Sequence, residues 1–195
     1  MAVTGFVSVK KPGDAAGRPS GKKNYVILFD WNDVKTLTID PDGVNVSAFT
    51  MASAKKPIAV YGTSETIACY DKLVGEVDGK GFQHLVDFST PGDTAELAAF
   101  RNAAVNKELG AIVINCGAKD AKLAGTPCAP LRFAKDDGKD DKEGVKHEIS
   151  LASEIPSDAL HRIPLNLIPK TGDTEIDDFL GLTADASPEA ASVGA

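Results

Sequence analysis

The side chains best suited to chemistry in this sequence are three histidines and three cysteines. They are spread along the chain and form no HxxxH, HExxH or CxxC pattern: His84, His147, His161, Cys69, Cys116 and Cys128. A zinc site needs three or four convergent ligands, so Cys116, Cys128 and a histidine are only a combinatorial possibility. We therefore assign no metal ligand, and we expect His84 to be a hydrogen-bonded residue on a strand.

Acidic residues suggest a second chemistry, because Ca²⁺ takes several carboxylate oxygens. Glu76 and Asp78 form one acidic group, and residues 136–143 form another. The second group interleaves Lys139 and departs from the loop pattern D-x-[DN]-x-[DN]-G-x5-E. We interpret residues 136–144 as a solvated charged loop rather than a calcium site.

Catalytic motifs are not evident in the sequence. Cys128 lies between two prolines, and neither a basic helix start nor a paired histidine adjoins it to lower its pKa. The run Gly79-Lys80-Gly81 is too short for a phosphate-binding loop, and no Gly-x-Ser-x-Gly elbow occurs. The sequence predicts no catalytic residue, no cofactor-binding residue and no enzyme, while a site assembled from distant residues stays an alternative.

Length and composition favour one domain with extensions. The chain has 195 residues, of which 43% are hydrophobic, enough for one sizeable core. We predict an extended arm over residues 1–24, a β-rich domain over 25–182 and a disordered tail over 183–195.

Charge and cysteine content indicate which partners and which cellular compartment to expect. A net charge of −7 with dispersed lysines argues against a surface that grips nucleic acid. The odd cysteine number argues against a disulfide framework and favours folding in a reducing cytoplasm. No signal-peptide core and no run of about 18 apolar residues is present, so we expect neither export nor a membrane span.

Most of the secondary structure is expected to be β. Runs rich in β-branched, aromatic and aliphatic residues predict strands. They cover residues 25–29, 35–39, 58–61, 66–70, 82–88, 111–114, 131–133 and 145–151. The first two are expected to form a hairpin-like start, while residues 44–57 give a weaker signal. The fold class predicted is mainly β (α+β): an antiparallel sandwich or barrel with one flanking helix.

That helix is predicted over about residues 93–108. Asp93 can cap its first N–H groups, and Glu96 completes an acidic capping box. Leu97, Phe100 and Ala104 then share one apolar face. Because glycine often ends a helix, Gly110 is expected to mark the stop.

The glycine and proline motifs of the chain resemble those of virion structural proteins of tailed phages. The resemblance covers most of residues 1–170 and is carried by glycine and proline motifs. These are KKPGD at 10–14, GKKN at 21–24, GEVD at 75–78, Gly81-Phe82 with His84, PGD at 91–93 and GTPCAPLRF at 125–133. Among virion proteins, the order of strands, one helix and further strands is similar to the tail tube fold of phages and type VI secretion systems.

The resemblance implies a role in assembly. In that family, small β-domains form hexameric rings whose sheets join into one inner barrel, and the rings stack. It implies a homo-oligomer in the virion tail, made in the host cytoplasm, with other tail or connector proteins as partners and DNA passing transiently through the lumen. Residues 10–23 and 44–57 would reach neighbouring subunits. A capsid decoration, head-completion or tail-terminator protein is the alternative, followed by a small metal-binding module or enzyme.

Overall fold

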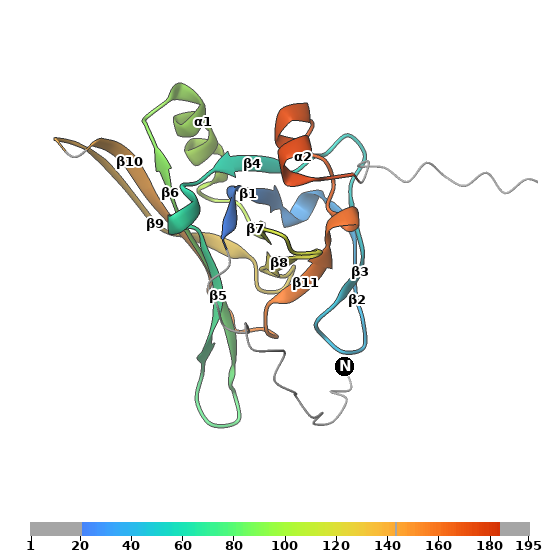
Figure 1. Cartoon of the computed structure of the whole chain (residues 1–195). Coiled ribbons are helices and arrows are strands. Elements are labelled where there is room, and N and C mark those ends of the chain that lie inside the picture. The colour runs from blue at the N-terminus through green and yellow to red at the C-terminus, as the bar shows by residue number, and fades with distance from the viewer. Residues whose placement is uncertain (1–20, 143, 184–195) are drawn as a thin grey trace, which may run out of the picture.

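The computed structural model describes residues 21–142 and 144–183. It is mainly β and antiparallel, as predicted, but not a closed barrel (Figure 1). The strands are β1 (Lys22–Asp30), β2 (Val34–Ile39), β3 (Val46–Met51), β4 (Ile58–Tyr61), β5 (Ala68–Val74), β6 (Gly81–Pro91), β7 (Leu109–Asn115), β8 (Asp120–Ala124), β9 (Leu131–Asp141), β10 (Gly144–Ser153) and β11 (His161–Pro164). The helices are α1 (Ala95–Ala104) and α2 (Thr174–Leu180), and the 3-10 turns are η1 (Trp31–Asp33), η2 (Ser64–Thr66) and η3 (Leu165–Leu167).

The strands form layers around a central group made of β4, β1, β7, β8 and β11. One nine-stranded sheet contains this group and the strands β9, β10, β6 and β5, joined at a corner where Leu109 of β7 pairs with Leu131 of β9. The central strand β7 is buried on both faces, and Ile112 and Val113 are both 0% exposed. Continuous apolar runs of this kind are typical of strands covered on both sides.

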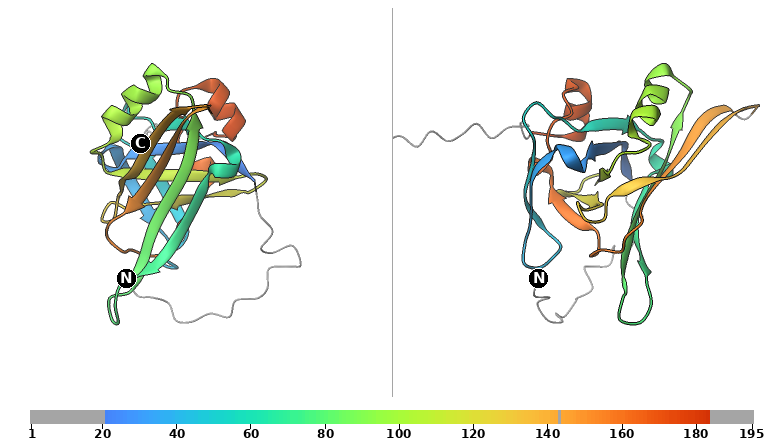
Figure 2. Two further views of the ribbon diagram at one scale, coloured as in Figure 1. Left: turned by 90° about the vertical axis from the view of Figure 1, so that its left-hand side faces the viewer. Right: turned by 180° about the vertical axis from the view of Figure 1, so that it is seen from behind.

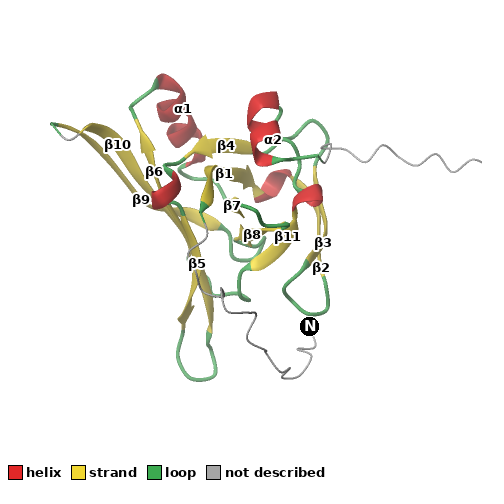
Figure 3. Ribbon diagram, viewed as in Figure 1, coloured by secondary structure: helices red, strands yellow, loops and turns green. Residues whose placement is uncertain are grey.

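Each face of the central layer has its own core cluster. Toward β5, β6, β9 and β10 the cluster includes Val26, Val113 and Leu151. Toward the small β2–β3 sheet and α2 it includes Ile27 and Ile112. Neighbouring residues of β1 therefore point into different cores, as alternation along a strand requires. Figure 3 shows both helices at the same end of the molecule.

The predicted hairpin-like start is wrong. The strand β1 pairs with β4 and β7, whereas β2 pairs with β3 in the separate sheet. Residues 44–57 are also more ordered than expected, because β3 lies within them and buries Phe49 and Met51 against the second core. The segment gave a weak signal because the buried residues of β3, Val46, Phe49 and Met51, do not alternate strictly.

The helix predicted over 93–108 is present but shorter. Thr94, not Asp93, caps α1 and accepts a hydrogen bond from the Leu97 N–H. Ala104 is buried as predicted, yet Gly110 is not a helix stop and lies inside β7. That glycine is needed because a Cβ at this position would lie 2.3 Å from the Phe29 ring.

A second helix, α2, was not predicted. Asp173 caps it by accepting from the N–H groups of Glu175 and Ile176, and Gly181 ends it with φ of 70°. Both are ordinary helix boundary signals. The helix has seven residues, too few for a clear apolar period, which explains why it was not predicted.

The predicted charged loop at 136–144 is also wrong. Strand β9 continues to Asp141, and after a short turn β10 begins at Gly144, so these acidic residues lie on a long hairpin. Water solvates both faces near its tip, so the strand carries charge without an apolar period. Of the predicted arm 1–24, Lys22 already belongs to β1; residues 1–20, and the tail beyond Thr183, lie outside the described residues.

Candidate functional site

Polar and charged side chains gather on the outer face of the strands β5, β6, β10 and β9, here called the open face. Residues paired across antiparallel strands point to the same side. The pairs Ser150–Asp87 and Ser150–Lys135 therefore place these three side chains together, and Glu148 shares the face with Ser89 and Asp137. The opposite side of the same strands carries Val86, Phe88 and Ile149 and packs on the core.

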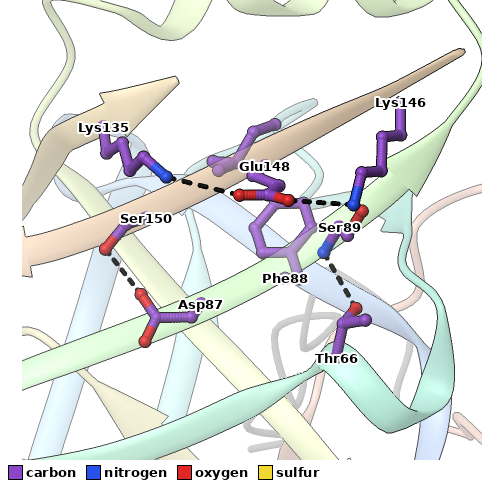
Figure 4. Close-up of a pocket in the computed structure, with 9 residues that line it drawn as sticks. Thr66, Asp87, Phe88, Ser89, Lys135, Lys146, Glu148 and Ser150 are labelled. Atoms are coloured by element: carbon purple, nitrogen blue, oxygen red, sulfur yellow. Dashed lines mark hydrogen bonds and ion pairs between the residues drawn. The ribbon is translucent and has the colours of Figure 1, made fainter. Parts of the chain in front are cut away.

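A shallow pocket of about 260 Å³ lies on the open face (Figure 4). Its centre is Glu148, whose carboxylate lies between two lysines. Lys135 Nζ is 3.3 Å from Glu148 Oε2, and Lys146 Nζ is 3.0 Å from Glu148 Oε1. Lys135 also pairs with Asp137 at 2.9 Å. The hydrogen bonds from Lys146 and Lys135 hold the pKa of Glu148 below its ordinary value, so the carboxylate stays charged.

A second polar group completes the pocket around Asp87. The Ser150 hydroxyl donates to Asp87 Oδ1, and the Tyr70 hydroxyl donates to Asp87 Oδ2 at 3.1 Å. Burial, and after it the hydrogen bond to Asp87, raises the pKa of Tyr70 and keeps its hydroxyl protonated. The charged side chains of the pocket are therefore bound to one another. This arrangement suits a hydrated surface of balanced charge better than proton transfer to a substrate.

The two outer edges of this sheet are open within the described residues. Strand β5 pairs with β6 alone, and residues 132–140 of β9 pair with β10 alone. Each successive pair from β5 to β9 is antiparallel, so the two edge strands run in opposite directions. Lys122 covers part of the first edge by donating from Nζ to the Cys69 carbonyl at 2.8 Å. Exposed edges of long strands are sites where another chain can pair.

Two histidines that are distant in sequence lie together in the core. The rings of His84 and His161 have centroids 6.3 Å apart at an interplanar angle of 87°. His84 Nδ1 accepts from the Gly125 N–H at 2.9 Å, so Nε2 carries the proton and donates to the Asp158 carbonyl. Burial lowers the pKa of both rings. Both are therefore neutral, and His84 is the hydrogen-bonded strand residue that the sequence predicts.

The third histidine joins α1 to the β9–β10 hairpin. His147 is 6% exposed, with Nδ1 3.5 Å from Asp136 Oδ1 and Nε2 3.6 Å from Asp93 Oδ1. Arg101 of α1 pairs with the other oxygen of Asp136. Gly138 leaves room for the ring, because a Cβ there would lie 2.6 Å from His147 Cε1. This cluster explains why Asp136, an acidic residue assigned to a loop, is instead held in place.

The cysteines are not brought together with the histidines as a metal site. Cys69 is buried, and burial raises its pKa to about 12, while Cys116 and Cys128 are exposed. Within residues 21–142 and 144–183, no group of three or more His, Cys, Asp or Glu side chains is arranged to hold a metal ion. Glu76 and Asp78 lie at the tip of the β5–β6 hairpin.

Comparison with known proteins gives no match to a family model, to a curated protein or to a solved structure. Neither helix in the described part of the chain combines the length and apolar character needed to cross a bilayer. The open face and its edges are therefore the features of the molecule that bear on its function.

Proposed function

We propose that this chain is a structural subunit of a phage tail tube and that copies of it form stacked rings around a channel for DNA. The observation that supports this most is the pair of open edges on the four antiparallel strands β5, β6, β10 and β9 of the large sheet. Rotation of one copy about a ring axis places its β9 beside β5 of the next copy. Because β5 and β9 run in opposite directions, the new pair is antiparallel, and the sheet continues without a break.

Such a junction would satisfy the backbone groups of both edges. Strands β6 and β9 each have 11 residues and β10 has 10, so the joined sheet would be tall. At about 3.4 Å a residue, an 11-residue strand is roughly 37 Å long. Ring closure removes the edges that would otherwise favour aggregation. The ring contact is head-to-tail, because each copy contributes β9 to one junction and β5 to the other.

The open face would then line the channel. Two of its lysines, Lys135 and Lys146, are paired with Asp137 and Glu148, so these positive charges are not available to hold phosphate. Affinity for DNA depends mainly on lysine and arginine contacts that release counterions. A self-neutralised wall would let DNA slide past, and the role requires no catalytic group, metal or cofactor from this chain.

Electron microscopy of the purified protein, combined with crosslinking, tests the proposal. Cys116 and Cys128 are first replaced by serine, and then Lys72→Cys in β5 is combined with Asp137→Cys in β9. A short bismaleimide should link copies into a ladder that ends at one closed species, and micrographs should show stacked rings. The control combines Lys72→Cys with Lys35→Cys in exposed β2, which lies outside this sheet and should give no ladder.

The remaining outcomes distinguish the alternatives. Isolated closed rings that never stack would favour a decoration, head-completion or tail-terminator protein. A protein that stays monomeric over all concentrations and ionic strengths, with no ladder, would contradict an assembly role. Stoichiometric zinc in elemental analysis would instead support the metal-binding module.

A further inference from the structure

The turn between β5 and β6 presents an exposed apolar side chain. Val77 lies at its tip with 81% of its surface exposed, between Glu76 and Asp78. In this turn Gly75 and Asp78 have φ of 98° and 70°, and the Gly79 N–H donates to the Glu76 carbonyl at 3.1 Å. A single exposed apolar residue is ordinary on a protein surface, so Val77 becomes a candidate contact only where a matching apolar groove is available.

An apolar groove of about 460 Å³ lies between α1 and the strands β1 and β4. Its apolar lining includes Leu28, Ile58 and Phe100, and Ile58 is 47% exposed. Ala99 and Ala103 of α1 also line it. Because these two side chains are small, the groove stays open and has room for an inserted valine with its neighbours.

The charges of the tip and of the groove are complementary. Around the groove, Lys107 pairs with Asp30 at 2.9 Å, and Lys55 pairs with Asp33 at 3.0 Å. Lys56 also lines the groove, is exposed and forms no ion pair within the described part of the chain. The rim thus carries three lysines against two aspartates, and the turn carries Glu76 and Asp78 against Lys80, so the net charges of rim and tip are opposite in sign.

The two features lie at opposite ends of the molecule. Figure 1 shows the β5–β6 turn at the bottom and α1 with β4 at the top, and both views in Figure 2 agree. A tip therefore cannot reach the groove of its own chain, but it can reach that of a copy stacked below. Contacts of this head-to-tail kind do not close and generate open stacks.

We propose that the Val77 turn of one copy inserts into the α1–β4 groove of a second copy in the next ring. Val77 fills the apolar recess beside Ala103, while Glu76 and Asp78 pair with Lys56. This inference rests on the proposed ring assembly. It assigns the stacking contact to the β5–β6 turn and to the α1–β4 groove, to which the segment 44–57 contributes Lys56, rather than to residues 10–23.

The test measures stacking separately from ring formation, by electron microscopy and light scattering. Val77→Asp should leave rings intact and raise the concentration needed for stacking at least tenfold. Val145→Asp places the same charge at a different exposed valine and should stack as the parent protein does. Lys56→Glu should impair stacking, and combining it with Glu76→Lys and Asp78→Lys should restore it, a rescue that misfolding cannot produce.

Three results would overturn the inference or its basis. Rings of Val77→Asp that stack like the parent, or a triple charge variant that stays unstacked, would refute the groove contact and leave the ring proposal standing. Failure of the parent protein to form rings would refute the ring proposal itself.

Discussion

The ring of Phe29 lies directly against the backbone of Gly110, so that a Cβ at this position would be 2.3 Å from Phe29 Cζ. The two residues face each other across the paired strands β1 and β7. Glycine is thus required here by contact with an aromatic ring and not by a turn. The close approach joins the central layer to the second core, where Phe29 packs edge-on against Trp31 and Phe49.

Gly110→Ala should therefore destabilise the protein. Overpacking of this kind costs about 1–3 kcal/mol, and a lower urea midpoint measured by circular dichroism would report it. Gly79→Ala is the matched control, because its Cβ would meet nothing within 4 Å. Equal midpoints for the two variants would show that the Phe29 contact is not tight in solution.

The buried histidines predict a loss of stability in acid. Burial holds the pKa of His84 and of His161 below the ordinary value of 6.5, so the unfolded chain binds protons more readily than the folded one. Their contribution is fully present above pH 6.5 and is lost as the pH falls through the folded pKa. The urea midpoint should fall between pH 7 and pH 5. His84→Gln should flatten this dependence, and an unchanged slope would contradict neutral burial.

The paired charges of the open face predict how DNA affinity can be increased. Asp137→Asn with Glu148→Gln frees Lys135 and Lys146 from their partners. Affinity for duplex DNA at low salt should rise by roughly tenfold, with a steeper salt dependence, as measured by fluorescence anisotropy. Glu175→Gln with Asp178→Asn removes the same charge from α2 and should have little effect. If both variants gain equally, net charge rather than the open face controls binding.

Thiol labelling should separate the three cysteines. Burial raises the pKa of Cys69 to about 12, whereas Cys116 and Cys128 are exposed. Because the thiolate is the reactive form, a maleimide at pH 7 should modify Cys116 and Cys128 in the native protein and all three in urea. Mass spectrometry of the peptides gives the result, and rapid native labelling at Cys69 would contradict its burial.

Local signals in the sequence predicted much of the secondary structure, and the errors have physical causes. Most strands and α1 follow from β-branched runs and capping residues, and the apolar run of β7 predicted its burial. The partner of β1 was not predictable, because its pairing with β4 and β7 depends on contacts far along the chain. The charged hairpin was missed because solvated strands lack the apolar period.

The candidate site was harder to predict from the sequence than the secondary structure was. The alternation that places Asp87, Ser150 and Lys135 on one face depends on strand register, and the register shifts between Ser150 and Leu151 of β10. Likewise, only the fold brings His84 beside His161. One signal was available: the polar positions between Val86, Phe88, Ile149 and Leu151 already marked a solvated face.

The number of strands between the two open edges bears on the size of any ring. An even number of strands separates the two open edges, so every junction in the proposed ring would be antiparallel whatever the number of copies. Strand direction therefore favours no particular symmetry. The circumference must instead be set by how strongly each sheet bends, and the irregular pairing at Ser150 is the natural place for sequence changes to alter the diameter.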